Sequence, residues 1–337
     1  MSSRDLSQHL REFRFHVDDE EIGLRLDHAL QGRIHWRSRT DLQLRVREKR
    51  ILLNGKPTKA SVRLQAGDEV IVLVSKDDLP DQDPAKVELE VLHEDRRLIV
   101  LAKQPGQVVH PTGRHVYDTL INALFLRYRR NGEDRQGVVP QVAHRLDRQT
   151  SGVLVIAKDL EAKRFLQDEF EARRPDKRYC GIVAGGPEAD HGVIDQPILR
   201  DATGTIRIRM KIDPAGAASC TDYQVVERFP DAALLRFRLH TGRQHQIRVH
   251  AQYLGHTLLC DPLYGDPREV GFDDGRGPTL TRQALHAEHL TIRHPDDGKE
   301  RTFTAPLPRD LTRTLEGLRD GRRLTWFEDR QSEHWRV

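Results

Sequence analysis

The sequence predicts an α+β fold in which a small α/β domain precedes a larger domain with a mixed, largely antiparallel sheet. Two observations predict it. From about residue 87 onward, short apolar runs recur without the regular strand–helix alternation that builds parallel sheets. Before that point, a compact basic segment carries its own helix and turn signals. We expect strands at 98–101, 152–157, 179–183, 222–226, 233–239 and 290–292, and helices at 159–171, capped by Asp159, and 245–254.

The basic segment spans residues 24–76 and holds 12 Lys and Arg against five Asp and Glu. Two short amphipathic helices are expected at 24–31 and 38–49, with Ser38 as the N-cap of the second. Strands are expected at 51–53 and 69–74, the first followed by an Asn54-Gly55 turn. This charge density in a compact segment predicts nucleic-acid binding, and a merely solvated basic face is the alternative.

The charge sign changes after this segment. Residues 76–84 read KDDLPDQDP, which is acidic, contains proline and lacks apolar periodicity, as expected for a linker. We therefore divide the chain into an N-terminal extension (1–14), a small domain (15–76), a linker (77–86), a large domain (87–310) and a charged C-terminal extension (311–337).

Composition limits the class of protein. Hydrophobic residues make up 37% and charged residues 32% of the chain, and we find no apolar run of membrane-spanning length and no signal-peptide core, so we expect a cytoplasmic protein. The three cysteines, Cys180, Cys220 and Cys260, are isolated in the sequence, which favours reduced thiols over disulfides or a zinc site.

The most informative segment is 144–152, HRLDRQTSG, which leads directly into the apolar run 153–157. Such a polar loop delivers side chains to the end of a buried strand. Asp147 is therefore a candidate nucleophile or base held by an arginine. The alternative is a surface turn with a solvated Asp–Arg pair.

Three more clusters carry chemistry. Tyr179 follows Lys177-Arg178 and could stack on a base or move a proton, although packing alone is the alternative. Thr241-Gly242 precedes a helical pattern and suits an anion at a helix N-terminus. A cationic cluster lies at 282–287. Four histidines, His240, His245, His250 and His256, have spacings that do not place two imidazoles on one helix face, so no metal is expected.

Some functions are excluded by missing motifs. The sequence has no GxGxxG and no P-loop, so no nucleotide cofactor is expected. The 144–147 segment differs in spacing from a kinase catalytic loop, and no Asp-Phe-Gly follows it.

Taken together, these motifs resemble the RluA-type pseudouridine synthases. The resemblance rests on 144–152, 177–179, 241–250 and 282–287, with Lys103-Gln104-Pro105-Gly106, His110-Pro111-Thr112, Gly255-His256, Tyr264-Gly265 and 305–308. Thr257 and Cys260 depart from the family pattern. The basic segment resembles the S4-type RNA-binding domain in 25–27, 38–39, 51–56 and 67–68, with a departure at 48–50.

The resemblance implies isomerisation of uridine to pseudouridine in RNA. It implies that Asp147 is the catalytic carboxylate, Tyr179 the active-site tyrosine, Arg248 the partner of Asp147, and Arg145 the residue that fills the space of a flipped-out nucleotide. We expect further RNA contacts from Arg25, Arg39, Lys56, Lys177 and Arg243. A carboxylate suits the positive charge that develops on the sugar, and an adjacent arginine keeps it ionised. This scheme needs no metal or cofactor.

The expected substrate is large-subunit (23S-type) ribosomal RNA, with tRNA as the alternative. A non-catalytic RNA-binding or ribosome-assembly protein is a second hypothesis, and a metal-dependent hydrolase a third. We expect a monomer.

Overall fold

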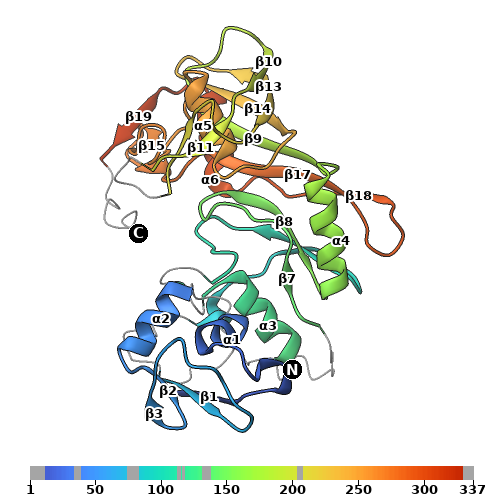
Figure 1. Ribbon diagram of the computed structural model, residues 1–337. Helices are drawn as coiled ribbons and strands as arrows, with labels where there is room; N and C mark the ends of the chain where they lie inside the picture. Colours follow the sequence, from blue (N-terminus) through green and yellow to red (C-terminus); the bar gives the residue numbers. More distant parts are fainter. Residues whose placement is uncertain are drawn as a thin grey trace. The chain divides into compact units, whose positions relative to one another are not determined.

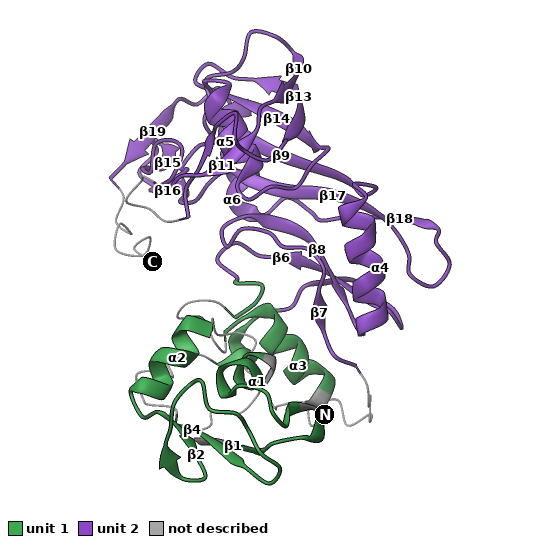
Figure 2. Cartoon of the chain, viewed as in Figure 1, with its two compact units in different colours: residues 1–88, 108–136 green, residues 89–107, 137–337 purple. Residues whose placement is uncertain are grey.

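The computed structural model describes residues 12–33, 39–73, 83–111, 115, 118–130, 138–202 and 208–328. The chain forms two compact units (Figure 2). Unit 1 comprises residues 1–88 and 108–136, and unit 2 comprises residues 89–107 and 137–337. Ser38, Thr112 and most of the expected linker lie outside the described residues.

Unit 1 contains a four-stranded sheet with strand order β1-β4-β2-β3, whose residues are drawn in shades of blue in Figure 1. Its strands are β1 (Glu12–His16), β2 (Ile51–Leu53), β3 (Lys56–Pro57) and β4 (Glu69–Leu73). Its helices are α1 (Leu26–Arg33), α2 (Arg39–Arg47) and α3 (Leu120–Arg130), with 3-10 turns η1 (Asp19–Glu21) and η3 (Pro84–Lys86). The helices and strands expected between residues 24 and 74 are therefore present, with ends shifted by one or two residues.

The hydrophobic core of unit 1 joins α1 and α2 to the sheet. Leu26 and Leu30 of α1 are fully buried beside Leu42 of α2 and Ile51 of β2. The turn between β2 and β3 has Asn54 at φ 51° and Gly55 at φ 73°, the left-handed conformation that an Asn-Gly hairpin turn requires. Local sequence chemistry thus sets this hairpin.

Unit 2 is built on a ten-stranded sheet of order β10-β13-β14-β9-β17-β8-β6-β5, to which β18 and β7 add. In this sheet every described strand pair is antiparallel except β17 with β8, so the expected mixed, largely antiparallel sheet is confirmed. Its strands are β5 (Val91–Glu94), β6 (Leu98–Lys103), β7 (Gln141–Val142), β8 (Ser151–Ala157), β9 (Asp176–Ala184), β10 (His191–Asp195), β13 (Cys220–Arg228), β14 (Ala232–Leu239), β17 (Leu285–Arg293) and β18 (Glu300–Thr304).

Within the part of unit 2 that the structure describes, three helices and two small sheets accompany the large sheet. The helices are α4 (Leu160–Glu171), α5 (Gln246–Tyr253) and α6 (Arg309–Arg319), and the remaining strands are β11 (Ile198–Arg200), β12 (Met210–Ile212), β15 (Glu269–Phe272), β16 (Pro278–Leu280) and β19 (Leu324–Phe327). The carboxylate of Asp159 accepts a hydrogen bond from the backbone N–H of Ala162, 2.8 Å away, so the expected N-cap of α4 is confirmed.

The parallel contact between β8 and β17 depends on a glycine. Gly152 has φ 121°, and a Cβ placed there would lie 2.2 Å from the carbonyl oxygen of Ala287. No other residue fits this approach. The close contact fixes the strand end that immediately follows the 144–150 loop.

The segment expected as a charged C-terminal extension, 311–337, includes most of α6 and the strand β19. Leu311, Leu315 and Leu318 of α6 are buried together with Phe272, and β19 pairs with β15. The three leucines follow helical spacing and form one apolar face, which the high charge of the segment concealed. Residues 309–327 therefore belong to the core of unit 2.

The expected domain limits stay predictions. The limit at residue 14 falls inside β1, and residues 108–136 group with unit 1 although the sequence assigns them to the large domain. Within the described residues, no helix is long and apolar enough to cross a membrane.

Candidate active site

Asp147 lies in the loop 144–150, called here the Asp147 loop, between β7 and β8. Two buried cations hold its backbone. The ammonium group of Lys103 donates to the carbonyl oxygens of Gln104, Arg148 and Thr150 at 2.8–3.1 Å. The guanidinium of Arg282 donates to the carbonyl oxygen of Gln149 at 2.8 Å. Three consecutive carbonyl groups after Asp147 are thus fixed from within the protein.

The carboxylate of Asp147 is backed by a buried arginine on α5. Arg248 donates through Nε and Nη2 to the two oxygens of Asp261, both at 2.8 Å, and through Nη1 to Oδ2 of Asp147 at 3.1 Å. The side chains of Arg248 and Asp261 are 5% and 0% exposed, whereas that of Asp147 is 23% exposed. Burial disfavours the charged guanidinium, but Asp261 and then Asp147 outweigh it and raise the pKa of Arg248.

A histidine and a tyrosine complete the surroundings of Asp147. Nε2 of His245 lies 3.7 Å from Oδ2 of Asp147, and its Nδ1 lies 2.8 Å from the hydroxyl of Tyr264. The ring of Tyr264 covers the guanidinium of Arg248 at 5.1 Å, a cation–π contact. Burial lowers the pKa of His245, so this imidazole is neutral near pH 7.

Tyr179 of β9 faces the same cavity as Asp147. Burial, reinforced by the charge of Asp147, raises the pKa of Tyr179, so the phenol keeps its proton near neutral pH. The cavity has a volume of about 70 Å³ and is lined by Arg145, Leu146, Asp147, Thr150, Tyr179, Leu239, Arg243, His245, Gln246, Ile247, Arg248 and Leu285. A carboxyl group and a protonated phenol therefore share one small cavity, whose lining also includes the side chains of Arg145, Arg243 and Arg248.

Most expected site residues of unit 2 converge here. Asp147, Tyr179, Arg248, Arg145 and Arg243 all line the Asp147 cavity.

Lys177 does not line the cavity, and His144 is structural. The Nζ of Lys177 donates to the carbonyl oxygen of Thr241 at 3.1 Å. Burial, with a smaller effect of Lys177, lowers the pKa of His144 to about 3, and its Nε2 accepts from the backbone N–H of Val155 at 2.9 Å.

Asp261, His245 and Tyr264 have no assigned role in the sequence-based expectations. The only signal for them is their presence in or beside segments that resemble the family pattern. Asp261 lies 13 residues after Arg248, beyond the end of α5, and a separation of that size has no periodicity that could reveal a contact.

Unit 1 holds the other expected RNA contacts, Arg25, Arg39 and Lys56. The fully buried carboxylate of Asp27 accepts from Nε of Arg25, Nε of Arg39 and the amide of Gln43 at 2.7–3.0 Å. The two arginine side chains remain 43% and 44% exposed. Lys56 is exposed on β3.

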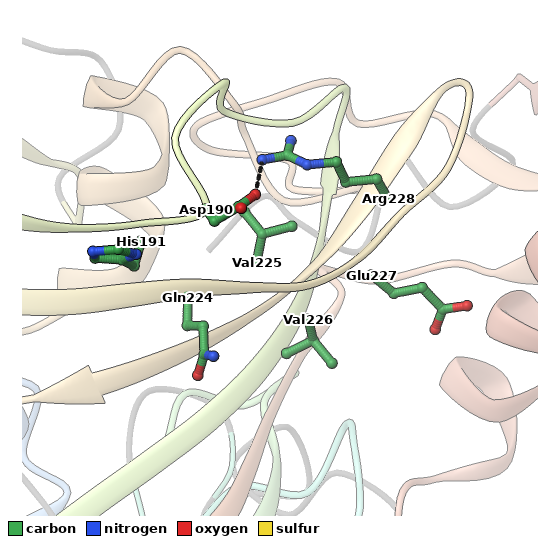
Figure 3. Close-up of a pocket in the computed structure, with 7 residues that line it drawn as sticks. All are labelled: Asp190, His191, Gln224, Val225, Val226, Glu227 and Arg228. Carbon is green, nitrogen blue, oxygen red and sulfur yellow. Dashed lines mark hydrogen bonds and ion pairs between the residues drawn. The ribbon is translucent and has the colours of Figure 1, made fainter.

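Two other features, a hollow and a cluster of possible metal ligands, contain none of the expected site residues. A larger hollow of about 500 Å³ is formed by 190–191 and 224–228 (Figure 3), where an ion pair joins Asp190 to Arg228. Cys220, Asp222 and His240 are the one group of possible metal ligands within the described residues, but His240 is hydrogen-bonded to Asp222 and burial raises the pKa of Cys220. Neither contains an expected catalytic residue.

Comparison with known proteins places this geometry in a family. Residues 97–253 match the RNA pseudouridylate synthase family. An RNA pseudouridine synthase of Bacillus subtilis is 35% identical over 90% of this chain and 97% of its own length. The ribosomal large subunit pseudouridine synthase D of Escherichia coli K12 is 34% identical over 90% and 93%.

Solved structures agree. Human RNA pseudouridylate synthase domain containing 1 is 26% identical, covers 73% of this chain and 91% of its own, and has a TM-score of 0.54. The extent of these matches, together with the ordered motifs around Asp147, shows that this chain belongs to the RNA pseudouridine synthases of the RluA type, which are isomerases acting on RNA.

Proposed function

We propose that this enzyme converts uridine to pseudouridine in large-subunit ribosomal RNA, with Asp147 as its catalytic carboxylate. The observation that carries the assignment is the Asp261–Arg248–Asp147 chain. It buries two of its three charges and leaves the third partly exposed in a cavity that also holds Tyr179. A solvated surface ion pair needs no such support.

The reaction breaks the C1′–N1 bond of uridine and forms a C1′–C5 bond, while the proton on C5 is lost and N1 gains a proton. It is an isomerisation, so no other reactant is consumed. Positive charge develops at the sugar as the C1′–N1 bond breaks. The carboxylate of Asp147 stabilises that charge or attacks it, and Arg248 holds the carboxylate through its Nη1.

We expect the target nucleotide to leave its helix before reaching the Asp147 cavity, because the target atoms of a base stacked in a helix cannot be reached. The target must therefore be extruded, which costs a few kcal/mol. Tyr179 can recover part of that cost by stacking against the base. Arg145 is exposed at the cavity lining, where it can occupy the space that the extruded nucleotide leaves in the RNA.

Unit 1 supplies a second RNA contact in this proposal, as an S4-like domain within residues 15–76. Arg25 and Arg39 are oriented by the buried Asp27 while their guanidinium groups stay accessible to phosphates. Lys177 and Arg243 would contact RNA beside the cavity. The large-subunit substrate is inferred from the name of the E. coli relative, and we propose a monomer acting in the cytoplasm.

The test replaces Asp147 by Asn, which removes the charge and keeps the shape. Pseudouridine formation should fall below detection, and RNA binding should persist, because the cations that contact phosphates are unchanged. Carbodiimide labelling followed by primer extension measures the product, and filter binding measures affinity. Asp190→Asn is the matched control, since Asp190 is exposed and lines a different hollow from Asp147.

Undiminished product from Asp147→Asn would contradict the proposal. Large-subunit RNA and bulk tRNA are offered as parallel substrates, and product on tRNA alone would move the assignment to the tRNA alternative. Absence of product from the wild-type enzyme on either RNA would favour the non-catalytic RNA-binding hypothesis.

A further inference from the structure

The two oxygens of the Asp147 carboxylate have different surroundings. Oδ2 faces Nη1 of Arg248 at 3.1 Å and Nε2 of His245 at 3.7 Å. No described residue donates a hydrogen bond to Oδ1. One oxygen is therefore held by the protein, and the other is available to a substrate.

The orientation of the His245 ring is fixed at its other nitrogen. The hydroxyl of Tyr264 accepts a hydrogen bond from the backbone N–H of Met210 at 2.8 Å, so its own proton is free to be donated to Nδ1 of His245. A neutral imidazole that accepts at Nδ1 carries its proton on Nε2. The N–H of the ring then points toward Asp147.

The neutral state of this ring has identified causes. Burial lowers the pKa of His245, Arg248 and Arg145 act in the same direction, and Asp147 and Asp261 oppose them. The side chain is only 6% exposed. Near neutral pH the imidazole therefore approaches Asp147 as a hydrogen-bond donor without a second positive charge.

We propose that His245 is a positioning residue: its Nε2–H, together with Arg248, holds Oδ2 of Asp147 so that Oδ1 is presented to the ribose of the target uridine. This inference rests on the proposed role of Asp147. A single hydrogen bond from Arg248 leaves the carboxylate free to swing, and a second donor from another direction fixes its plane. The distance of 3.7 Å is longer than a hydrogen bond, as is common before substrate tightens a catalytic site.

A purely structural role makes a different prediction. His245 has φ 56° at the start of α5, and its ring packs edge-on against Tyr264. Asn tolerates this left-handed conformation best among non-glycine residues. If His245 only served the turn, Asn would be its best replacement and Gln a poor one.

The experiment compares His245→Gln, His245→Asn and His245→Ala. The amide nitrogen of Gln can take the position of Nε2 and keep a donor toward Asp147, whereas that of Asn takes the position of Nδ1 and does not. We expect the Asn and Ala variants to lose roughly 10- to 100-fold in kcat, as for a misplaced catalytic group. KM should change little, and the Gln variant should recover most of the loss.

The order of the variants decides the proposal. Asn as active as Gln or more, equal loss in all three, or wild-type kcat in the Ala variant would each overturn it. Tyr264→Phe gives a second measurement that leaves the His245 backbone unchanged and removes only the hydroxyl that orients the ring. Its kcat should fall between those of wild type and His245→Ala. An unchanged kcat would contradict the claim that Tyr264 orients the His245 ring.

Asp147→Asn is assayed in parallel to separate the two proposals. An active Asp147→Asn enzyme would contradict the proposed role of Asp147 itself. An inactive Asp147→Asn with a fully active His245→Ala would remove only the positioning role.

Discussion

Two clusters of arginine and aspartate in this protein are built in opposite ways. In unit 1 the acid is inside, because Asp27 is fully buried and its partners Arg25 and Arg39 are about half-exposed. In unit 2 the arginine is inside, because Arg248 is buried between a buried Asp261 and a partly exposed Asp147. The first cluster presents cations to the solvent, and the second presents a carboxylate.

The difference shows that the buried member of an ion pair determines which charge faces the solvent. A buried charge must be paired, so its orientation is strongly restrained, and it restrains the partner that reaches the surface. Cations suit phosphate, and a carboxylate suits a sugar that becomes positive. In the proposed function, the same residue types thus serve binding in one unit and chemistry in the other.

The largest expected effect on stability tests the buried member of the second cluster. Asp261→Asn removes the main partner of a buried guanidinium, and breaking such a pair costs about 3–5 kcal/mol. Asp147→Asn should cost less than about 1 kcal/mol, because Asp147 is partly solvated and the Asp261–Arg248 pair survives. Urea unfolding measures both. Equal losses would contradict the distinction between a buried support and an exposed reactive group.

The sequence predicts the parts of this site that depend on local pattern. Asp159 caps α4, the 51–57 hairpin forms at Asn54-Gly55, and the Asp147 loop precedes a buried strand, because neighbouring residues determine each of these features. The resemblance of residues 241–250 to the family also implies the Arg248–Asp147 pair, which the structure contains.

The contacts that support the site are distant in sequence and were not predictable from local pattern. Lys103 reaches carbonyl groups 45 and 47 residues away, and Arg282 reaches one 133 residues away. His144 illustrates the reverse case, since it belongs to the most informative motif but accepts a hydrogen bond from a backbone N–H and stacks on Phe170. The order of the strands in the sheet determines which residues distant in sequence, such as Lys103 and Arg282, reach these carbonyl groups.

Lys103 provides a comparison with Arg248, because it is a buried cation held by carbonyl groups and not by a hydrogen-bonded acid. Lys103→Met keeps the volume and leaves three carbonyl groups without this donor, so we expect a loss of about 1–3 kcal/mol in the free energy of unfolding. Exposed Lys299→Met is the control.

The Lys103 effect should also depend on pH. Burial lowers the pKa of Lys103 to about 7, with Arg282 in the same direction and Asp147 opposing, whereas lysine in an unfolded chain has a pKa of ~10.4. Between these values the unfolded state binds more protons, so the contribution of Lys103 to stability rises with pH. The difference in unfolding free energy between wild type and Lys103→Met should grow from pH 7 to about 10. A difference that stays flat would contradict the lowered pKa.

The last expected effect on stability concerns Asp27, the buried member of the first cluster. Hydrogen bonds from Arg25, Gln43 and Arg39 hold its pKa well below the usual range despite burial, so its contribution to stability is present at neutral pH and is lost as the pH falls. Asp27→Asn should cost about 1–3 kcal/mol at pH 7, and this difference should shrink in acid.

Asp27→Asn should also weaken RNA binding without changing its salt dependence, because the number of cations is unchanged and only their orientation is lost. Arg25→Gln should instead reduce the slope of log affinity against log salt by about one, since one phosphate contact disappears. Filter binding at several salt concentrations measures both variants. If Asp27→Asn lowered the slope as Arg25→Gln does, Asp27 would not act by orienting cations. The proposal that the first cluster presents oriented cations to RNA would then be wrong.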